Sequence, residues 1–264
     1  MPVVLASFLL GLEQRLVFTG AFDRQRGFVE TPTDYGVPFE SITITTEDDV
    51  ALNAWTLFAE KPNGRWLIYF HGQGANISHY LSLTAQWVER GYNVLMVDYR
   101  GYGSSEGTPS EAGLYLDAQG SYAYLLERDI QPNNIVIYGF SLGSGVAVDL
   151  ASKVEVGALV VEAGYTSLVD VVRSLYSPIL TGFVTNRFES TAKIAQVAAP
   201  TAFIHATDDR VIPERQGRIL FEQATAEKIF LTVQGGHLAM LEAPQDRTFR
   251  VLTAFLDGQM EKEQ

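Results

Sequence analysis

Short and nearly continuous apolar runs recur along the chain. They span residues 66–70, 94–97, 135–138, 158–161, 202–204 and 229–233. Runs of this length without polar alternation are typical of strands that are covered on both faces. Such strands occur in parallel sheets whose two faces are packed by helices. The pattern therefore predicts a parallel sheet as the centre of the fold.

The pattern is different before residue 60, where apolar and polar residues alternate. Residues 43–45 and 52–58 show this alternation on either side of the acidic turn Glu47, Asp48 and Asp49. Two alternating runs joined by a short polar turn are typical of an antiparallel hairpin. We expect this hairpin to form one edge of the sheet.

Segments with helical periodicity lie between the predicted strands. They span residues 78–90, 111–128, 143–153, 214–224 and 245–256. Local signals mark the start of the second segment: Thr108 is expected to cap it, with Pro109 at the first helical position and Glu111 closing a capping box. Pro213 and Pro244 are similarly placed before the last two segments.

This alternation predicts an α/β fold with helices on both faces of one mostly parallel sheet. No internal repeat or low-complexity linker divides the chain, so we expect one domain over residues 1–264. Residues 1–38 would form an N-terminal apolar helix and lead-in. The longest interruption is residues 164–200, in which helical periodicity is confined to residues 168–175, and we expect a small lid here after the sixth strand.

Composition excludes several classes of function. The chain has 264 residues, of which 47% are hydrophobic, so it can bury a substantial core. Its net charge of −12 argues against nucleic-acid binding and disfavours anionic membrane surfaces, because both attract basic proteins. It has no cysteine, which excludes disulfides, thiolate metal sites and a thiol nucleophile.

Residues 2–12 form an uncharged, apolar stretch at the N-terminus. About 20 such residues are needed for a helix to cross a bilayer, so this stretch is too short. It also lacks the preceding basic residue of a secretory signal. We expect it to lie on the protein body rather than to make a weak membrane contact. The sequence accordingly favours a cytoplasmic location over a membrane-associated one, and leaves a longer upstream anchor and the oligomeric state open.

A G-x-S-x-G pentapeptide, Gly139 to Gly143, stands between a predicted strand and a predicted helix. A turn of this kind holds its serine on a sharp, strained bend, where small flanking residues let strand and helix pack closely. The serine hydroxyl stays exposed at the top of the sheet. Ser141 is therefore the candidate nucleophile of an acyl-transfer reaction.

Serine needs an adjacent base, usually a histidine that a carboxylate orients. The chain has 4 histidines. Behind such a turn, the partners follow in the order nucleophile, acid, base, which excludes His71 and His79. His205 lies within or at the end of a predicted strand, ahead of any acid that could follow it, and we expect it to be structural. His237 follows the last strand in a glycine-rich loop and is the candidate base.

The acid should follow a strand and precede a helix. Asp208 and Asp209 both satisfy this condition, and only one of them can point at His237. Glu162, at the end of another predicted strand, is a more distant candidate, and its alternative interpretation is a polar group that closes that strand.

At this point, the order of the motifs and their strand contexts resemble the α/β-hydrolase superfamily from about Phe39 onward. In that superfamily the acid commonly precedes one variable residue, two apolar residues and a proline. The resemblance therefore implies Asp209 as the acid, before Arg210 and Pro213. It also implies two backbone N–H donors for the oxyanion, from Leu142 and from Gln73 in a His-Gly loop.

The glycine-rich loop at residues 98–104 also resembles a recurrent loop of the superfamily. Asp98 and Arg100 are expected to brace this loop by ion pairing and backbone hydrogen bonds. The loop has neither the Lys-Ser/Thr ending of a phosphate loop nor the dinucleotide spacing, so no cofactor is expected. No metal is expected either.

These inferences and the resemblance together imply a serine hydrolase that cleaves small to medium carboxylic esters through an acyl-enzyme. Within enzymes, the alternatives are a thioesterase or deacylase, a lysophospholipase-like or monoacylglycerol-lipase-like enzyme, and a peptidase. A catalytically silent binding module is the alternative from another class, because one fold hosts many functions.

Overall fold

The computed structural model describes residues 13–22, 27–175, 181–182, 184–243 and 245–258. The predicted apolar stretch at residues 2–12 and Pro244 lie outside the described residues, as does part of the predicted lid.

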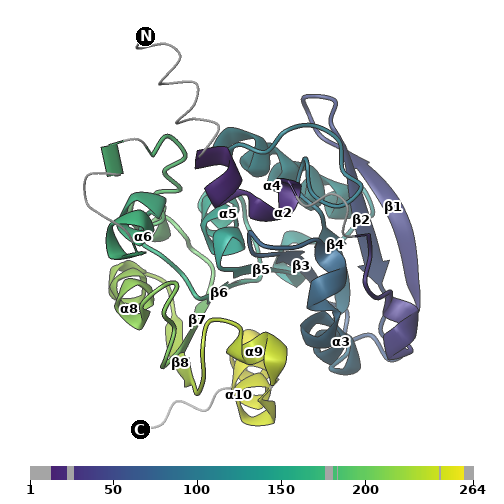
Figure 1. The fold of residues 1–264 in the computed structure, drawn as a ribbon. Helices are drawn as coiled ribbons and strands as arrows, with labels where there is room; N and C mark the ends of the chain where they lie inside the picture. The colour runs from purple at the N-terminus through teal and green to yellow at the C-terminus, as the bar shows by residue number, and fades with distance from the viewer. Residues whose placement is uncertain (1–12, 23–26, 176–180, 183, 244, 259–264) are drawn as a thin grey trace, which may run out of the picture.

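One eight-stranded sheet, in the order β1-β2-β4-β3-β5-β6-β7-β8, forms the centre of the described chain (Figure 1). β1 pairs antiparallel with β2 and β2 with β4, while all other neighbours are parallel. The strands are β1 Phe39–Thr45, β2 Ala51–Leu57, β3 Trp66–Phe70, β4 Asn93–Val97, β5 Ile135–Phe140, β6 Ala158–Glu162, β7 Thr201–Ala206 and β8 Lys228–Val233. This confirms the predicted parallel sheet with an antiparallel hairpin at its edge.

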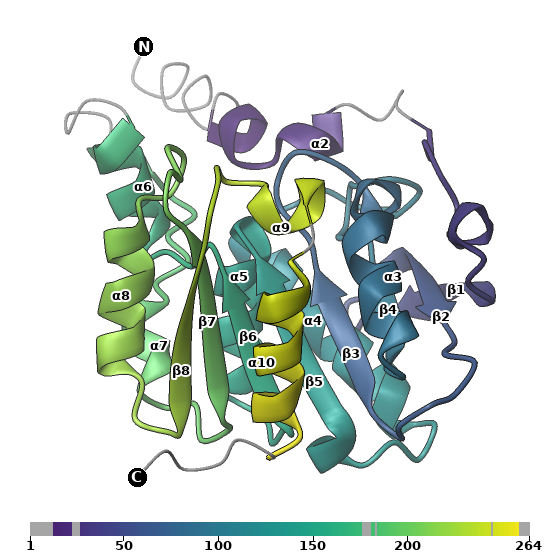
Figure 2. The ribbon, with the colours of Figure 1, turned by 90° about the horizontal axis from the view of Figure 1, so that it is seen from below.

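Helices cover both faces of the sheet (Figures 1 and 2). The longer helices are α3 Leu81–Glu89, α4 Glu111–Leu126, α5 Leu142–Ala151, α6 Leu168–Leu175, α8 Glu214–Gln223 and α10 Asp246–Leu256. Short ones are α2 Thr19–Phe22, α7 Thr191–Ile194 and α9 Ala239–Glu242, with 3₁₀ turns η1 Pro32–Tyr35, η2 Ile77–Tyr80 and η3 Pro132–Asn134. α3 and α10 pack on one face, and α4, α5 and α8 on the other.

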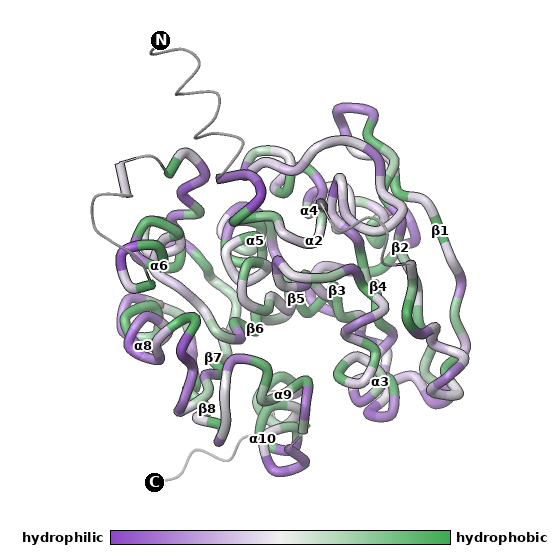
Figure 3. The backbone as a smooth tube through the Cα atoms, viewed as in Figure 1, coloured by the Kyte–Doolittle hydropathy of each residue, from purple (hydrophilic) through white to green (hydrophobic). Residues whose placement is uncertain are grey.

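The sheet separates two hydrophobic cores because side chains alternate across a strand. In β3, Leu67 belongs to the core under α3 and α10, and Ile68 to the core under α4 and α5. Both are fully buried, which explains why the strand has no polar alternation. In Figure 3 the inner strands are accordingly mostly hydrophobic, and hydrophilic residues lie toward the periphery.

The predicted capping of α4 is wrong in its residues. The helix begins at Glu111, and the Oγ of Ser110 accepts a hydrogen bond from the N–H of Gly113 at 3.1 Å. Thr108 and Pro109 therefore lie before the cap rather than at it. Ser110 takes this role because its backbone is extended, as a capping residue requires.

The predicted helix at residues 78–90 is divided into the 3₁₀ turn η2 and helix α3. Asn76 caps η2, because its side-chain oxygen accepts a hydrogen bond from the N–H of Ser78 at 3.0 Å. Gly91, with a φ of 89°, ends the segment after α3.

The parallel strands all end at one edge of the sheet, where α2 and α9 also lie (Figure 2). Loops at this edge carry most of the candidate site residues, as the predicted topology requires. In the part of the chain that the structure describes, the helices are too short or too polar to cross a membrane.

Candidate active site

Ser141 occupies a strained turn between β5 and α5. Its φ of 52° and ψ of −118° are unusual for a residue with a side chain, and such conformations cost about 1–3 kcal/mol. The turn is tight: a Cβ on Gly139 would lie 2.3 Å from the carbonyl oxygen of Gly143, and one on Gly143 would lie 2.0 Å from that of Phe70. Both glycines are therefore required by the close approach of strand and helix. The serine is only 7% exposed.

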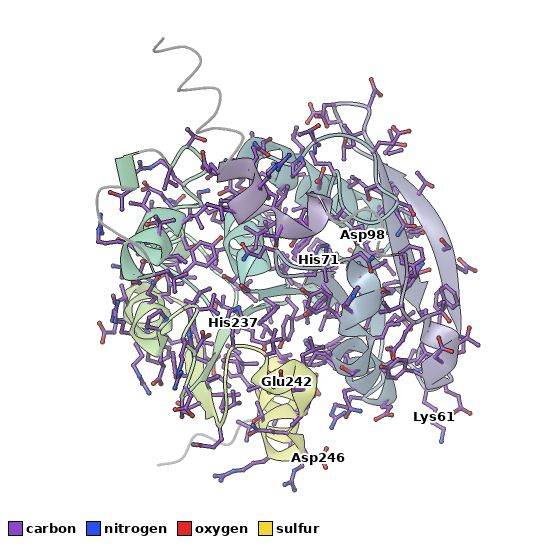
Figure 4. All side chains as sticks on the ribbon, in the orientation of Figure 1. Lys61, His71, Asp98, His237, Glu242 and Asp246 are labelled. Carbon is purple, nitrogen blue, oxygen red and sulfur yellow. The ribbon has the colours of Figure 1, made fainter. Side chains whose placement is uncertain are left out.

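The structure brings Ser141, His237 and Asp209 together in one line of hydrogen bonds. The Oγ of Ser141 lies 2.9 Å from Nε2 of His237, and Nδ1 of His237 lies 2.7 Å from Oδ2 of Asp209. His237 is in the loop between β8 and α9 and is labelled in Figure 4. Such a line gives the serine a base and gives the base an orienting carboxylate.

Asp209 is held by its own loop. Its Oδ1 accepts hydrogen bonds from the N–H groups of Val211 at 2.9 Å and Ile212 at 2.8 Å, which leaves Oδ2 for His237. Burial raises the pKa of the Asp209 carboxyl, but the hydrogen bonds from His237 and from the two backbone N–H groups outweigh it, so the pKa lies below its ordinary value. Asp208 is exposed, with Thr207 as its side-chain partner.

His205 is structural, as the sequence predicts. Its Nε2 lies 2.8 Å from the carbonyl oxygen of Ile212 and so stabilises the loop that carries Asp209. A Cβ on Gly217 would lie 2.4 Å from the His205 ring, so the glycine makes room for it. Burial lowers the pKa of His205, which keeps the ring neutral beside Asp209.

Glu162 lies buried at the end of β6. Within the described residues, it forms no hydrogen bond with His237. Its Oε2 accepts a hydrogen bond from the Tyr138 hydroxyl at 2.5 Å. Burial raises the pKa of Glu162 to about 7, with a further contribution from the charge of Asp209. Its carbonyl oxygen accepts from the N–H of Ser141 at 3.0 Å and so ties the turn to β6.

The His-Gly loop lies beside the serine turn. A Cβ on Gly72 would lie 3.0 Å from the ring of Phe140, the residue before Ser141. On the other side of the turn, Gly143 lies against Phe70 and His71, since a Cβ there would lie 2.8 Å from the carbonyl oxygen of His71. The predicted donors Gln73 and Leu142 therefore belong to two neighbouring segments.

The N–H groups of Gln73 and Leu142 have no hydrogen-bond acceptor within the described residues. Leu142 is the first residue of α5, so its N–H is one of the groups that a helix leaves unpaired at its start. The positive end of the helix dipole adds a favourable field for an anion there. The two unpaired N–H groups and the helix dipole are suited to stabilise an oxyanion. In the sequence, these two donors are implied only by the resemblance to the α/β-hydrolase superfamily.

The loop at residues 98–104 is braced, but through different partners from those expected. Arg100 forms ion pairs with Asp117 and Asp48, each at 2.7 Å, rather than with Asp98. Asp98 is buried, accepts from the N–H of Ile77 at 2.9 Å and lies 3.7 Å from Nε2 of His71 (Figure 4). Burial raises the pKa of Asp98 to about 7 and lowers that of His71 to about 4. His71 and His79, which the order of the motifs excludes as the base, do not contact Ser141.

The sequence reasoning missed the residues that support the site from a distance in the chain. Tyr138 holds Glu162, and Tyr99 donates its hydroxyl to the carbonyl oxygen of His71 at 2.9 Å. Tyr138 stands in the apolar run at residues 135–138, and Tyr99 stands between Asp98 and Arg100 in the glycine-rich loop. No local signal would have identified either contact.

Comparisons with known proteins agree with this fold. Residues 61–164 match the sequence model of the family described as serine aminopeptidase, S33. The esterase Pf2001 of Pyrococcus furiosus has a TM-score of 0.73 at 22% identity, over 87% of this chain and 95% of that one. An α/β hydrolase from Vibrio vulnificus has a TM-score of 0.74 at 21% identity, over 91% of both chains.

The chain belongs to the α/β-hydrolase superfamily, and the match to this family supports hydrolase activity. It is similar to protein bem46 of Schizosaccharomyces pombe, with 33% identity over 83% of this chain and 77% of that protein. It is also similar to the α/β hydrolase domain-containing protein WAV2 of Arabidopsis thaliana, with 29% identity over 83% of this chain and 78% of that protein.

Proposed function

We propose that this hydrolase is a serine esterase that cleaves carboxylic esters through an acyl-enzyme. The observation that carries the proposal is the pair of contacts from His237, to Ser141 at 2.9 Å and to Asp209 at 2.7 Å. Both distances are within hydrogen-bonding range for a nucleophile and its base. A silent binding module has no need of this alignment or of the strained serine turn.

In the first half of the reaction, the Oγ of Ser141 attacks the ester carbonyl carbon while Nε2 of His237 takes the hydroxyl proton. The charge that develops on the carbonyl oxygen is stabilised by the N–H groups of Gln73 and Leu142. When the tetrahedral intermediate collapses, the C–O bond to the alcohol breaks and His237 returns the proton to the alcohol. The acyl group remains on Ser141.

In the second half, His237 takes a proton from water and the resulting hydroxide attacks the acyl carbon. Collapse of this intermediate releases the carboxylic acid and returns the proton to Ser141. Asp209 stays ionised throughout, because its lowered pKa favours the charge that stabilises the imidazolium.

Small to medium acyl esters are the proposed substrates, with monoacylglycerols and lysophospholipids as larger members of the same class. The net charge of −12 disfavours polyanionic leaving groups such as coenzyme A, since repulsion lowers their local concentration. A peptidase uses the same three residues, and the matched family is described as serine aminopeptidase. Aminoacyl amides therefore belong in the substrate panel.

Replacement of Ser141 by alanine tests the proposal. We expect hydrolysis of p-nitrophenyl esters to fall at least 10³-fold, within the range found when a member of such a triad is removed. Ser144 provides a matched control, because its hydroxyl donates to the carbonyl oxygen of Ser141 at 2.7 Å and does not contact His237. If Ser141→Ala keeps hydrolysis within tenfold of the wild type, the proposed nucleophile is wrong.

A further inference from the structure

Residues 13–22 lie across the edge of the sheet at which the parallel strands end (Figure 2). We call this segment the strap. It contains helical residues 13–17 and helix α2. One end of the strap contacts the loop that carries Gln73, and the other end contacts residues 184–188 of the predicted lid.

The C-terminal end of the strap fixes Gln73. The carbonyl oxygen of Gln73 accepts from the N–H of Gly20 at 2.8 Å, from the hydroxyl of Thr19 at 3.1 Å and from that of Tyr102 at 3.2 Å. With its amide oriented to satisfy its hydrogen bonds, the Gln73 side chain donates to the carbonyl oxygen of Val17 at 3.0 Å. Side chain and carbonyl are both held by the strap, which restrains the Cα atom that carries the Gln73 N–H group.

The N-terminal end of the strap is anchored by Glu13, which is only 8% exposed. Its Oε1 accepts from the N–H groups of Thr185 and Asn186, both at 2.8 Å, and its Oε2 from the Thr185 hydroxyl at 2.5 Å. Hydrogen bonds to a buried carboxylate are stronger than those between neutral groups. The rings of Phe18 and Phe188, both fully buried, add an edge-to-face contact at 6.4 Å.

The anchored segment continues to the lid helix. The carbonyl oxygen of Arg187 accepts from the N–H of Leu168, the first residue of α6, at 2.7 Å. A continuous set of contacts thus joins α6 to the oxyanion loop through the strap. Movement of the strap would displace both the loop that carries Gln73 and the segment that contacts α6.

We propose that the strap is a positioning element of the active site, with Glu13 and Gly20 as its positioning residues for the Gln73 N–H. The inference rests on the proposed esterase function and assigns to it residues far from the triad in the sequence. Its physical basis is that a donor misplaced by about 1 Å costs about 10²-fold in rate, while binding of the ester changes little. The strap therefore acts on kcat rather than on KM.

Gly20→Ala is the first test. The added Cβ would lie 2.7 Å from a ring carbon of Tyr102, 2.9 Å from the Ala75 nitrogen and 3.0 Å from the carbonyl oxygen of Gln73, so the strap or the loop must move. We expect kcat for a p-nitrophenyl ester to fall about 10- to 100-fold with KM within threefold. Gly27→Ala is the matched control, because nothing lies within 4 Å of its Cβ, and it should keep the wild-type kcat.

Glu13→Ala and Glu13→Gln test the other end. The alanine variant should lower kcat about tenfold, whereas glutamine keeps an oxygen for the N–H groups of Thr185 and Asn186 and should recover most of it. Thermal unfolding of each variant identifies any that does not fold, and Glu13→Ala compared with Glu13→Gln still tests the proposal if Gly20→Ala is unfolded.

Wild-type kcat in Gly20→Ala and Glu13→Ala, or a rise in KM at constant kcat, would overturn the strap proposal alone. Labelling of the wild-type chain by a fluorophosphonate separates failure of the strap proposal from failure of the esterase proposal. A wild-type chain that neither labels nor hydrolyses esters would overturn both.

Discussion

Replacement of Asp209 by asparagine separates the role of its charge from its role in the loop. The Oδ1 of Asp209 accepts from the N–H groups of Val211 and Ile212, and the amide oxygen of asparagine can keep both contacts. The other contact changes sign: an NH₂ group replaces Oδ2, which lies 2.7 Å from Nδ1 of His237. The loop therefore keeps its shape while the histidine loses its orienting carboxylate.

The expected loss follows from the tautomer of His237. Facing a donor, Nδ1 must act as an acceptor, so the ring proton moves to Nε2 and the base can no longer accept the Ser141 proton. Changes of this kind cost about 10⁴-fold in kcat, or about 5 kcal/mol of transition-state stabilisation. KM should change little, because neither carboxylate oxygen is directed at the substrate.

Steady-state hydrolysis of a p-nitrophenyl ester measures this loss, with Asp208→Asn as the control. Asp208 is exposed and its carboxylate accepts from Thr207 at 3.0 Å, so its replacement should leave kcat within twofold of the wild type. If Asp209→Asn stays within tenfold of wild type, or if Asp208→Asn loses as much activity, Asp209 is not the carboxylate that orients His237.

Two further predictions concern stability. Because burial raises the pKa of Glu162 from 4.5 to about 7, its contribution is fully present below pH 4.5 and is lost as the pH rises to about 7. In urea unfolding at pH 8, the free energy of unfolding of Glu162→Gln should therefore be up to about 3 kcal/mol higher than that of wild type. This gain should disappear toward pH 4.5. If the unfolding free energies of the two proteins change in parallel with pH, the raised pKa of Glu162 is wrong. Gly143→Ala should lower the melting temperature by more than about 5 °C, because its Cβ would lie 2.0 Å from the carbonyl oxygen of Phe70. Gly182→Ala, with nothing within 4 Å, should not, and equal melting temperatures would argue against the tight turn.

Local patterns were sufficient for the sheet and the serine turn. An apolar run such as residues 135–138 predicts a strand buried on both faces, and the glycines around Ser141 are required by contacts within the same turn. The choice between Asp208 and Asp209 depends on which side chain faces the loop interior. Only the superfamily pattern selects Asp209 from the sequence.

Contacts between distant segments could not be predicted. The partners of Arg100 lie in a hairpin turn and in α4, so its pairing depends on how those elements pack. The same is true of the contact from Gly20 to Gln73, since nothing near residue 20 indicates an oxyanion loop. The sequence does not identify the capping residue of α4, because Thr108 and Ser110 are both suitable by type and only backbone conformation distinguishes them.

Intact-protein mass spectrometry after reaction with a fluorophosphonate shows whether Ser141 is an activated nucleophile. The reagent forms a phosphorus–oxygen bond with the serine and releases fluoride, so one adduct is expected per wild-type chain, and peptide mapping should place it on Ser141. Labelling should disappear in Ser141→Ala and slow by orders of magnitude in His237→Ala, because the base at 2.9 Å is lost. A folded wild-type chain without an adduct, or with an adduct that persists in Ser141→Ala, would show that Ser141 is not the nucleophile.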